Sequence, residues 1–199
     1  MSRIKRSILL NASEVLATLD GRKTQHRIPV NPQPGDGGLQ LADVWEERTG
    51  SRCPRAFNSP FGGPGDVLWV KETWRTTKDQ DHLKPRECCH AISIQYKADM
   101  GSQFPGETPQ EWGKWRPSVF MMLPFSRVRL LVKRVWVERV RDLSETDAKA
   151  EGSDPCESWK RSYQYRDGFS DRWNSAYGKK GLGTSTNPWI WASEFEVLP

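Results

Sequence analysis

The stretch Ser126 to Val140, SRVRLLVKRVWVERV, is the longest strand pattern in the chain and decides the fold. Its many β-branched side chains predict one long strand, or two strands joined by a bend. Those side chains are Val128, Val132, Val135, Val137 and Val140. Basic residues punctuate the same stretch, so the strand is expected to add positive charge to the sheet.

Shorter strand patterns lie on both sides of this stretch. Pro64-Gly65 supplies a turn before the apolar run from Asp66 to Trp74. The final run, Trp189 to Leu198, places large aromatic side chains at one parity. Further strands are expected at Ser7 to Leu10, Arg27 to Val30 and Ala91 to Ala98, and short helices at Asn11 to Asp20, Ser144 to Gly152 and Trp159 to Tyr177. This mixture predicts a β-dominated α+β fold.

Two long polar stretches, at about 31–65 and 75–117, are predicted to be loop insertions in that fold. The first is rich in Pro and Gly, with one or two helical turns expected at Leu39 to Arg48. The second begins with a charged segment, Arg75 to His90, that is expected to form an exposed hairpin loop. Loops this long in a compact domain are usually functional or mobile.

Composition fits a single domain over residues 1–199. Hydrophobic residues make up only 36% of the chain, but ten of them are Trp, which favours sheets with large aromatic side chains. No apolar run approaches 18 residues, so we expect a cytoplasmic protein without a membrane partner. The four cysteines, Cys53, Cys88, Cys89 and Cys156, lack the C-x-x-C spacing of zinc sites. We therefore expect free thiols, no metal and no cofactor.

Positive charge is concentrated in two segments of the chain. Residues 1–30 carry six Lys or Arg against two acids, and residues 114–141 carry eight against one. Within the first segment, GRKTQHR at Gly21 to Arg27 follows the end of the first expected helix. Such concentration suits the neutralisation of phosphates, so RNA or single-stranded DNA is an expected partner. The alternative is an ordinary solvated face beside a helix terminus.

Four motifs in order resemble the phage and prophage branch of the ASCH domain family. They are LDGRKTQHR at 19–27, PGDVLWVKETW at 64–74, WRPS at 115–118 and NPWIW at 187–191. The resemblance implies a PUA-like β-barrel with short flanking helices, here with the two loop insertions. It also implies a basic cleft for RNA, single-stranded DNA or a modified nucleoside. We expect that cleft between Lys23 to Arg27 and the strand around Arg127 to Arg134.

The same resemblance implies three candidate catalytic residues. One ASCH branch hydrolyses an acetylated cytidine nucleoside with a Lys, a nucleophilic Thr three residues later and a Glu. Here Lys23 and Glu151 match the Lys and the Glu, whereas His26 stands at the Thr position and Thr24 lies two residues before it. An imidazole, an amine and a buried carboxyl can still activate water against an amide or cleave RNA without a metal. However, residues 23 and 26 point to opposite faces of a regular strand.

The remaining candidates are expected to bind the nucleic acid or nucleoside. Aromatic rings beside arginines are suited to stacking on a base, and basic side chains to contacting phosphate. The candidates are Arg22, Thr24, Arg27, Glu72, Trp74, Trp115, Arg116, Arg127 and Arg129. Glu72 and Arg116 are equally suited to structural ion pairs. Binding without chemistry is thus the main hypothesis, a metal-independent amidohydrolase or ribonuclease is the rival, and a phage accessory protein that binds a host protein through its acidic loops is the third.

Overall fold

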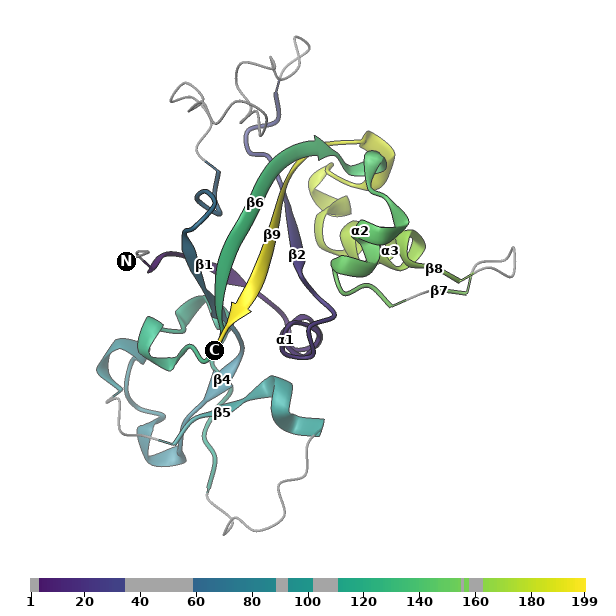
Figure 1. The fold of residues 1–199 in the computed structure, drawn as a ribbon. Helices are drawn as coiled ribbons and strands as arrows, with labels where there is room; N and C mark the ends of the chain where they lie inside the picture. The colour runs from purple at the N-terminus through teal and green to yellow at the C-terminus, as the bar shows by residue number, and fades with distance from the viewer. Residues whose placement is uncertain (1–3, 35–58, 89–92, 102–110, 155, 158–162) are drawn as a thin grey trace.

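The computed structural model describes residues 4–34, 59–88, 93–101, 111–154, 156–157 and 163–199, and a five-stranded sheet is its centre (Figure 1). The strand order is β1-β3-β6-β9-β2. β1 is parallel to β3, and every other neighbouring pair is antiparallel. The strands are β1 (Ile4–Leu9), β2 (Gln25–Pro29), β3 (Val67–Lys71), β6 (Arg129–Arg139) and β9 (Trp189–Leu198).

The sheet wraps around one apolar core. Buried side chains from every strand or its flanking residue meet there, with Val15 from helix α1 (Ala12–Leu19). A register shift between Val132 and Arg134 marks an irregularity in the longest strand, of the kind that bends a sheet. The two edge strands, β1 and β2, do not pair with each other, so the described residues form no closed barrel. The strand-rich α+β class is confirmed, and the expected barrel is not found.

Helix α1 begins at a reciprocal cap that the local sequence encodes. The Asn11 side chain accepts from the Glu14 N–H at 3.0 Å, and the Glu14 carboxylate accepts from the Asn11 N–H at 2.9 Å. Gly21 follows the helix at φ 72°, a left-handed conformation that turns the chain toward β2. The predicted helix from Asn11 to Asp20 is confirmed, and Asn11 is its N-cap.

A second apolar cluster lies beyond the sheet, where α2 (Glu145–Ala150) and α3 (Tyr165–Tyr177) pack together. Ser144 caps α2 by accepting from the Asp147 N–H at 3.0 Å, as its sequence predicts. Phe169 and Trp173, one helical turn apart, anchor α3, and Ile190 of β9 joins the same cluster. A short hairpin of β7 (Cys156–Glu157) and β8 (Tyr163–Gln164) lies between the helices in sequence.

The third cluster belongs to the second insertion, where β4 (Trp74–Arg75) pairs with β5 (Gln95–Tyr96). The strand predicted from Ala91 to Ala98 is shorter here, because a 3-10 turn at Lys97–Gly101 follows Tyr96 directly. Residues 75–88 are not a plain exposed loop, since they form two 3-10 turns, Lys78–Gln80 and Pro85–Glu87, beside this cluster.

The predicted turns at Leu39 to Arg48, Cys53 and Cys89 lie outside the described residues. In the described part of the chain, no helix has both the length and the apolarity to cross a membrane.

Gly152, at the end of α2, is expected to tolerate no side chain. Its φ is +71°, and a Cβ there would meet the Cβ atoms of Lys23 at 3.0 Å and Ala17 at 3.1 Å. Gly181 has nearly the same φ, +73°, but no heavy atom within 4 Å of the added carbon. Gly181→Ala should therefore lower the free energy of unfolding by roughly 1–2 kcal/mol, the cost of a left-handed backbone for alanine. Gly152→Ala should lower it by about 1–3 kcal/mol more, because of the close contacts. Urea unfolding of both variants measures the difference, and equal costs would contradict this close packing.

Candidate active-site cleft

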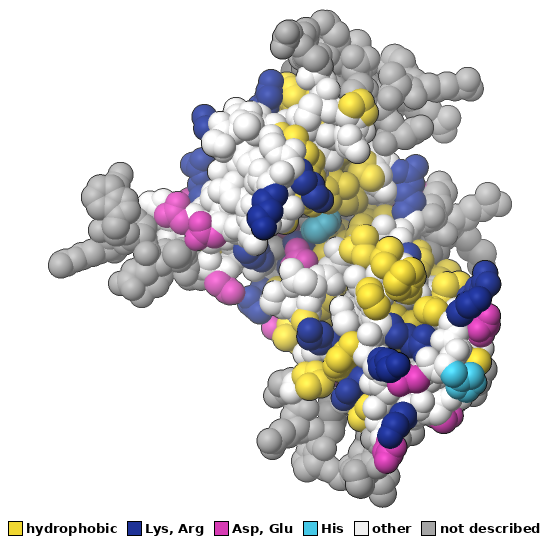
Figure 2. All heavy atoms as spheres, turned by 180° about the vertical axis from the view of Figure 1, so that it is seen from behind, with side chains coloured by type: hydrophobic (Ala, Val, Ile, Leu, Met, Phe, Trp, Pro, Cys, Tyr) yellow, Lys and Arg dark blue, Asp and Glu magenta, His cyan; other side chains and the backbone are white. Residues whose placement is uncertain are grey.

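A cleft of about 530 Å³ lies in the gap between the two edge strands of the sheet. Ser7, Ile8 and Leu9 of β1 line one side and His26, Arg27 and Ile28 of β2 the other, while α1 and α3 supply further walls. Figure 2 shows the molecule from behind, where hydrophobic and basic side chains gather around a hollow. The lining of the cleft combines aromatic and ionisable side chains, as the linings of small-molecule sites do.

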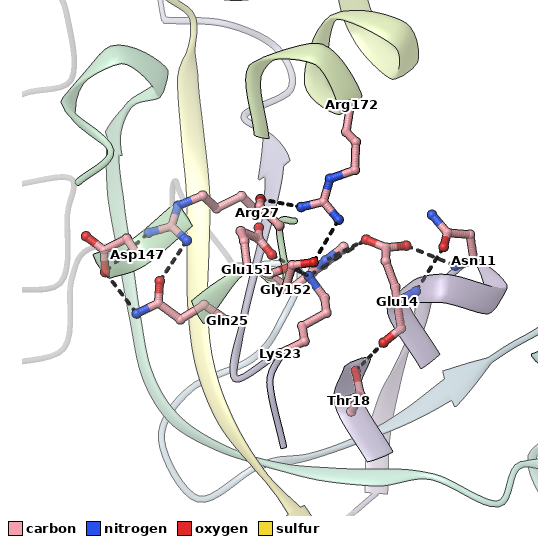
Figure 3. Close-up of polar contacts among 12 residues, drawn as sticks. Asn11, Glu14, Thr18, Lys23, Gln25, Arg27, Asp147, Glu151, Gly152 and Arg172 are labelled. Atoms are coloured by element: carbon pink, nitrogen blue, oxygen red, sulfur yellow. Dashed lines mark hydrogen bonds and ion pairs between the residues drawn. The ribbon is translucent and has the colours of Figure 1, made fainter. Parts of the chain in front are cut away.

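A buried ion pair between Lys23 and Glu151 lies at the wall of this cleft (Figure 3). The two side chains are 1% and 5% exposed, and the Lys23 ammonium also donates to the Glu151 carbonyl oxygen at 3.0 Å. The backbones form an antiparallel bridge, and the Thr24 N–H donates to Ala150 O at 2.8 Å. Glu151 lines the cleft, whereas Lys23 does not.

Glu14 joins this pair to His26. One carboxylate oxygen of Glu14 lies 3.7 Å from the Lys23 Nζ and 4.0 Å from the His26 Nδ1. Because Lys23 precedes β2 instead of lying within it, the strand alternation that separates residues 23 and 26 does not apply. The structure therefore brings all three candidate catalytic residues, Lys23, His26 and Glu151, together, and adds Glu14 to them.

Burial and charge shift the pKa values of two ionisable groups in the cleft lining, His26 and Glu151. Burial, assisted by the positive charges of Lys23, Arg27 and Arg172, places the pKa of His26 well below its ordinary value of 6.5. The imidazole is thus neutral at physiological pH. Burial also raises the pKa of Glu151, and the neighbouring cations only partly offset this effect. A neutral base and a carboxyl that holds a proton more readily than usual are the two components of acid–base catalysis.

Arg27 is buried beside the same site, but its charge is already balanced. Its guanidinium donates to Glu138 at 2.7 Å and to Gln25 at 2.7 Å, and it lies 3.9 Å from Asp147. The same group stacks on the Trp136 ring, 5.5 Å from its centroid. We therefore interpret Arg27 as a structural part of the cleft wall, because its charge is paired with carboxylates and not with a phosphate.

The expected boundary of the cleft at Arg127 to Arg134 is wrong, because β9 lies between β2 and β6 in the sheet. Arg127 instead donates to Glu72 at 2.9 Å and to Asp99 at 2.8 Å, and lies over the Tyr96 ring. Glu72 is 1% exposed, which matches the alternative of a structural ion pair. Arg129 is exposed at the start of β6, away from the cleft.

The aromatic and basic candidates of the second insertion also lie away from the cleft. Trp74 is fully buried against Phe125, so its ring is not available to stack on a base. Arg116 donates to the carbonyl oxygens of Leu83 and Gln80 and thereby anchors its loop. Trp115 is half-buried under the Arg75 guanidinium, 4.4 Å from the ring centroid.

Arg22 and Thr24, the last two candidates, flank Lys23 but do not line the cleft. Arg22 is exposed and lies 3.5 Å from Asp20 and 3.7 Å from Asp154. Thr24 contributes its backbone to the bridge with α2, and its carbonyl oxygen accepts from the Phe195 N–H at 2.9 Å. No set of three or more metal-ligating side chains is found within the described ranges.

No family model and no curated protein matches the chain. The structure is similar to that of protein EF3133 from Enterococcus faecalis V583, a DUF984 protein, with a TM-score of 0.44 and 8% identity, over 100% of this chain and 82% of that chain. This likeness assigns no function, so the geometry of the cleft is the basis for proposing one.

Breaking the Lys23–Glu151 pair from either side should destabilise the protein strongly. Lys23→Met or Glu151→Gln alone leaves a buried group without its partner, at a cost of roughly 3–5 kcal/mol, whereas the double variant should recover part of that loss. The exposed pair Lys133–Glu196, at 3.1 Å, is the control and should be worth at most about 1 kcal/mol. Denaturant unfolding of the complete double-mutant cycle tests this, and additive single losses would contradict the coupling.

Proposed function

We propose that the cleft binds a modified nucleoside and hydrolyses an acyl amide on its base. The observation that carries this proposal is the gathering of His26, Glu14, Glu151 and Lys23 at one wall of an amphipathic cleft. A volume of about 530 Å³ is within the usual range of small-molecule sites, roughly 300–1,000 Å³. The resemblance to the ASCH amidohydrolase branch supports the same interpretation, and we infer that the open sheet is a PUA-like barrel whose gap is the cleft.

The charge balance favours a small ligand over a nucleic-acid chain. Lys23 and Arg27, the expected phosphate contacts, are both buried and matched by carboxylates. Arg127 is likewise held by Glu72 and Asp99. Counterion release requires exposed cations that track a backbone, and these three do not provide them. Binding of RNA or single-stranded DNA without chemistry is therefore the second candidate.

The neutral imidazole of His26 acts as the general base in this proposal. Glu14 faces Nδ1, which leaves Nε2 to accept a proton from a water molecule. The water oxygen attacks the amide carbonyl carbon and forms a tetrahedral intermediate.

The Lys23–Glu151 pair acts as the proton donor. It delivers a proton through the Glu151 carboxyl to the leaving amine as the C–N bond breaks. The products are a carboxylic acid and the free amine of the base. The proton that His26 took from water then returns to the pair and restores the site.

Turnover should depend on His26 and Glu151 and persist below neutral pH. His26→Ala and Glu151→Gln should each lower the rate of N4-acetylcytidine hydrolysis by roughly 100-fold or more. His82 is exposed and serves as the control, so His82→Ala should leave this rate unchanged. Because the pKa of His26 is lowered, kcat/KM should hold as pH falls to 6.5 and decline only in more acidic solution.

Release of cytidine, followed by chromatography, is the measurement. Binding of N4-acetylcytidine without any turnover by the unaltered protein would make the cleft a receptor and not an active site. Absence of both binding and turnover would remove the proposal.

A further inference from the structure

Among the residues that the structure describes, no carboxylate pairs with Arg172. It lines the cleft from α3, and its guanidinium donates to Gly152 O at 3.3 Å and to Ser153 Oγ at 2.5 Å (Figure 3). Both acceptors are uncharged. Within the described ranges, Arg172 makes no ion pair, in contrast to Lys23 and Arg27.

Phe169 and Trp173 anchor α3 in the second apolar cluster, and Arg172 lies beside them in the sequence and lines the cleft. Its charge reaches the site, because it is one of the three cations that lower the pKa of His26. A partly buried guanidinium held in place by two neutral oxygens is preorganised for an anion.

We propose that Arg172 binds a phosphate group of the substrate, so that the cleft accepts a modified nucleotide in preference to the uncharged nucleoside. The inference rests on the proposed function and specifies its substrate class. Arginine suits this role because its planar fork can donate two parallel hydrogen bonds to phosphate oxygens. Phosphate is the anionic group that a nucleoside ordinarily carries, and a cleft of about 530 Å³ suits one nucleotide and not a chain.

Binding measured by calorimetry tests this proposal without requiring turnover. The full chain should bind cytidine 5′-monophosphate roughly 10- to 100-fold more tightly than cytidine, as expected for charged hydrogen bonds. Arg172→Gln should reduce that ratio to about one, and Arg172→Lys should keep it above one because the charge remains. Arg166→Gln, on the exposed part of the same helix, removes the same charge and should leave the ratio unchanged.

The outcomes separate this inference from the proposed function. Equal binding of the nucleotide and the nucleoside, or a preference that survives Arg172→Gln, would overturn the inference while hydrolysis of N4-acetylcytidine would still support the proposed function. Tighter binding of a ten-nucleotide RNA than of the mononucleotide would also overturn it, in favour of a nucleic-acid backbone as the source of phosphate. If no nucleoside or nucleotide binds, both proposals fail.

Discussion

The buried Lys23–Glu151 pair is the interaction on which the rest of the site depends. Taking two charges out of water costs several kcal/mol per ion, so the pair must be held by close geometry and further hydrogen bonds. The structure supplies these through the backbone bridge between the two residues and the Glu151 carbonyl oxygen. Apolar residues of similar size commonly stabilise a fold as much as a buried ion pair does, or more. We therefore interpret the pair as serving chemistry more than stability.

The pair matters because of where it joins the fold. It links the turn before β2 to the end of α2, and thus the central sheet to the helical cluster that carries α3. The cleft lies at this junction, in the gap that the sheet leaves between β1 and β2. The gap between the two edge strands, together with α1 and α3, can therefore present apolar and ionisable side chains to one ligand.

Much of the fold could be predicted locally, because periodicity and capping act within a few residues. The final strand, Trp189–Leu198, has the predicted bounds, and Ser144 caps its helix as its position suggests. The strand order could not be predicted, and it is β9, placed between β2 and β6, that removes Arg127 from the cleft. Glu14 caps α1 through contacts within three residues of sequence, but its approach to His26 depends on tertiary packing. Arg172 had no local signal.

A crystal structure of the His26→Asn protein, which keeps the Lys23–Glu151 pair, with N4-acetylcytidine 5′-monophosphate tests the central claim most directly. Our account predicts the ligand in the gap between β1 and β2, with its amide carbonyl carbon beside position 26 and its phosphate on Arg172. A ligand bound outside this gap, or an empty cleft at a ligand concentration that saturates the protein in solution, would contradict the account.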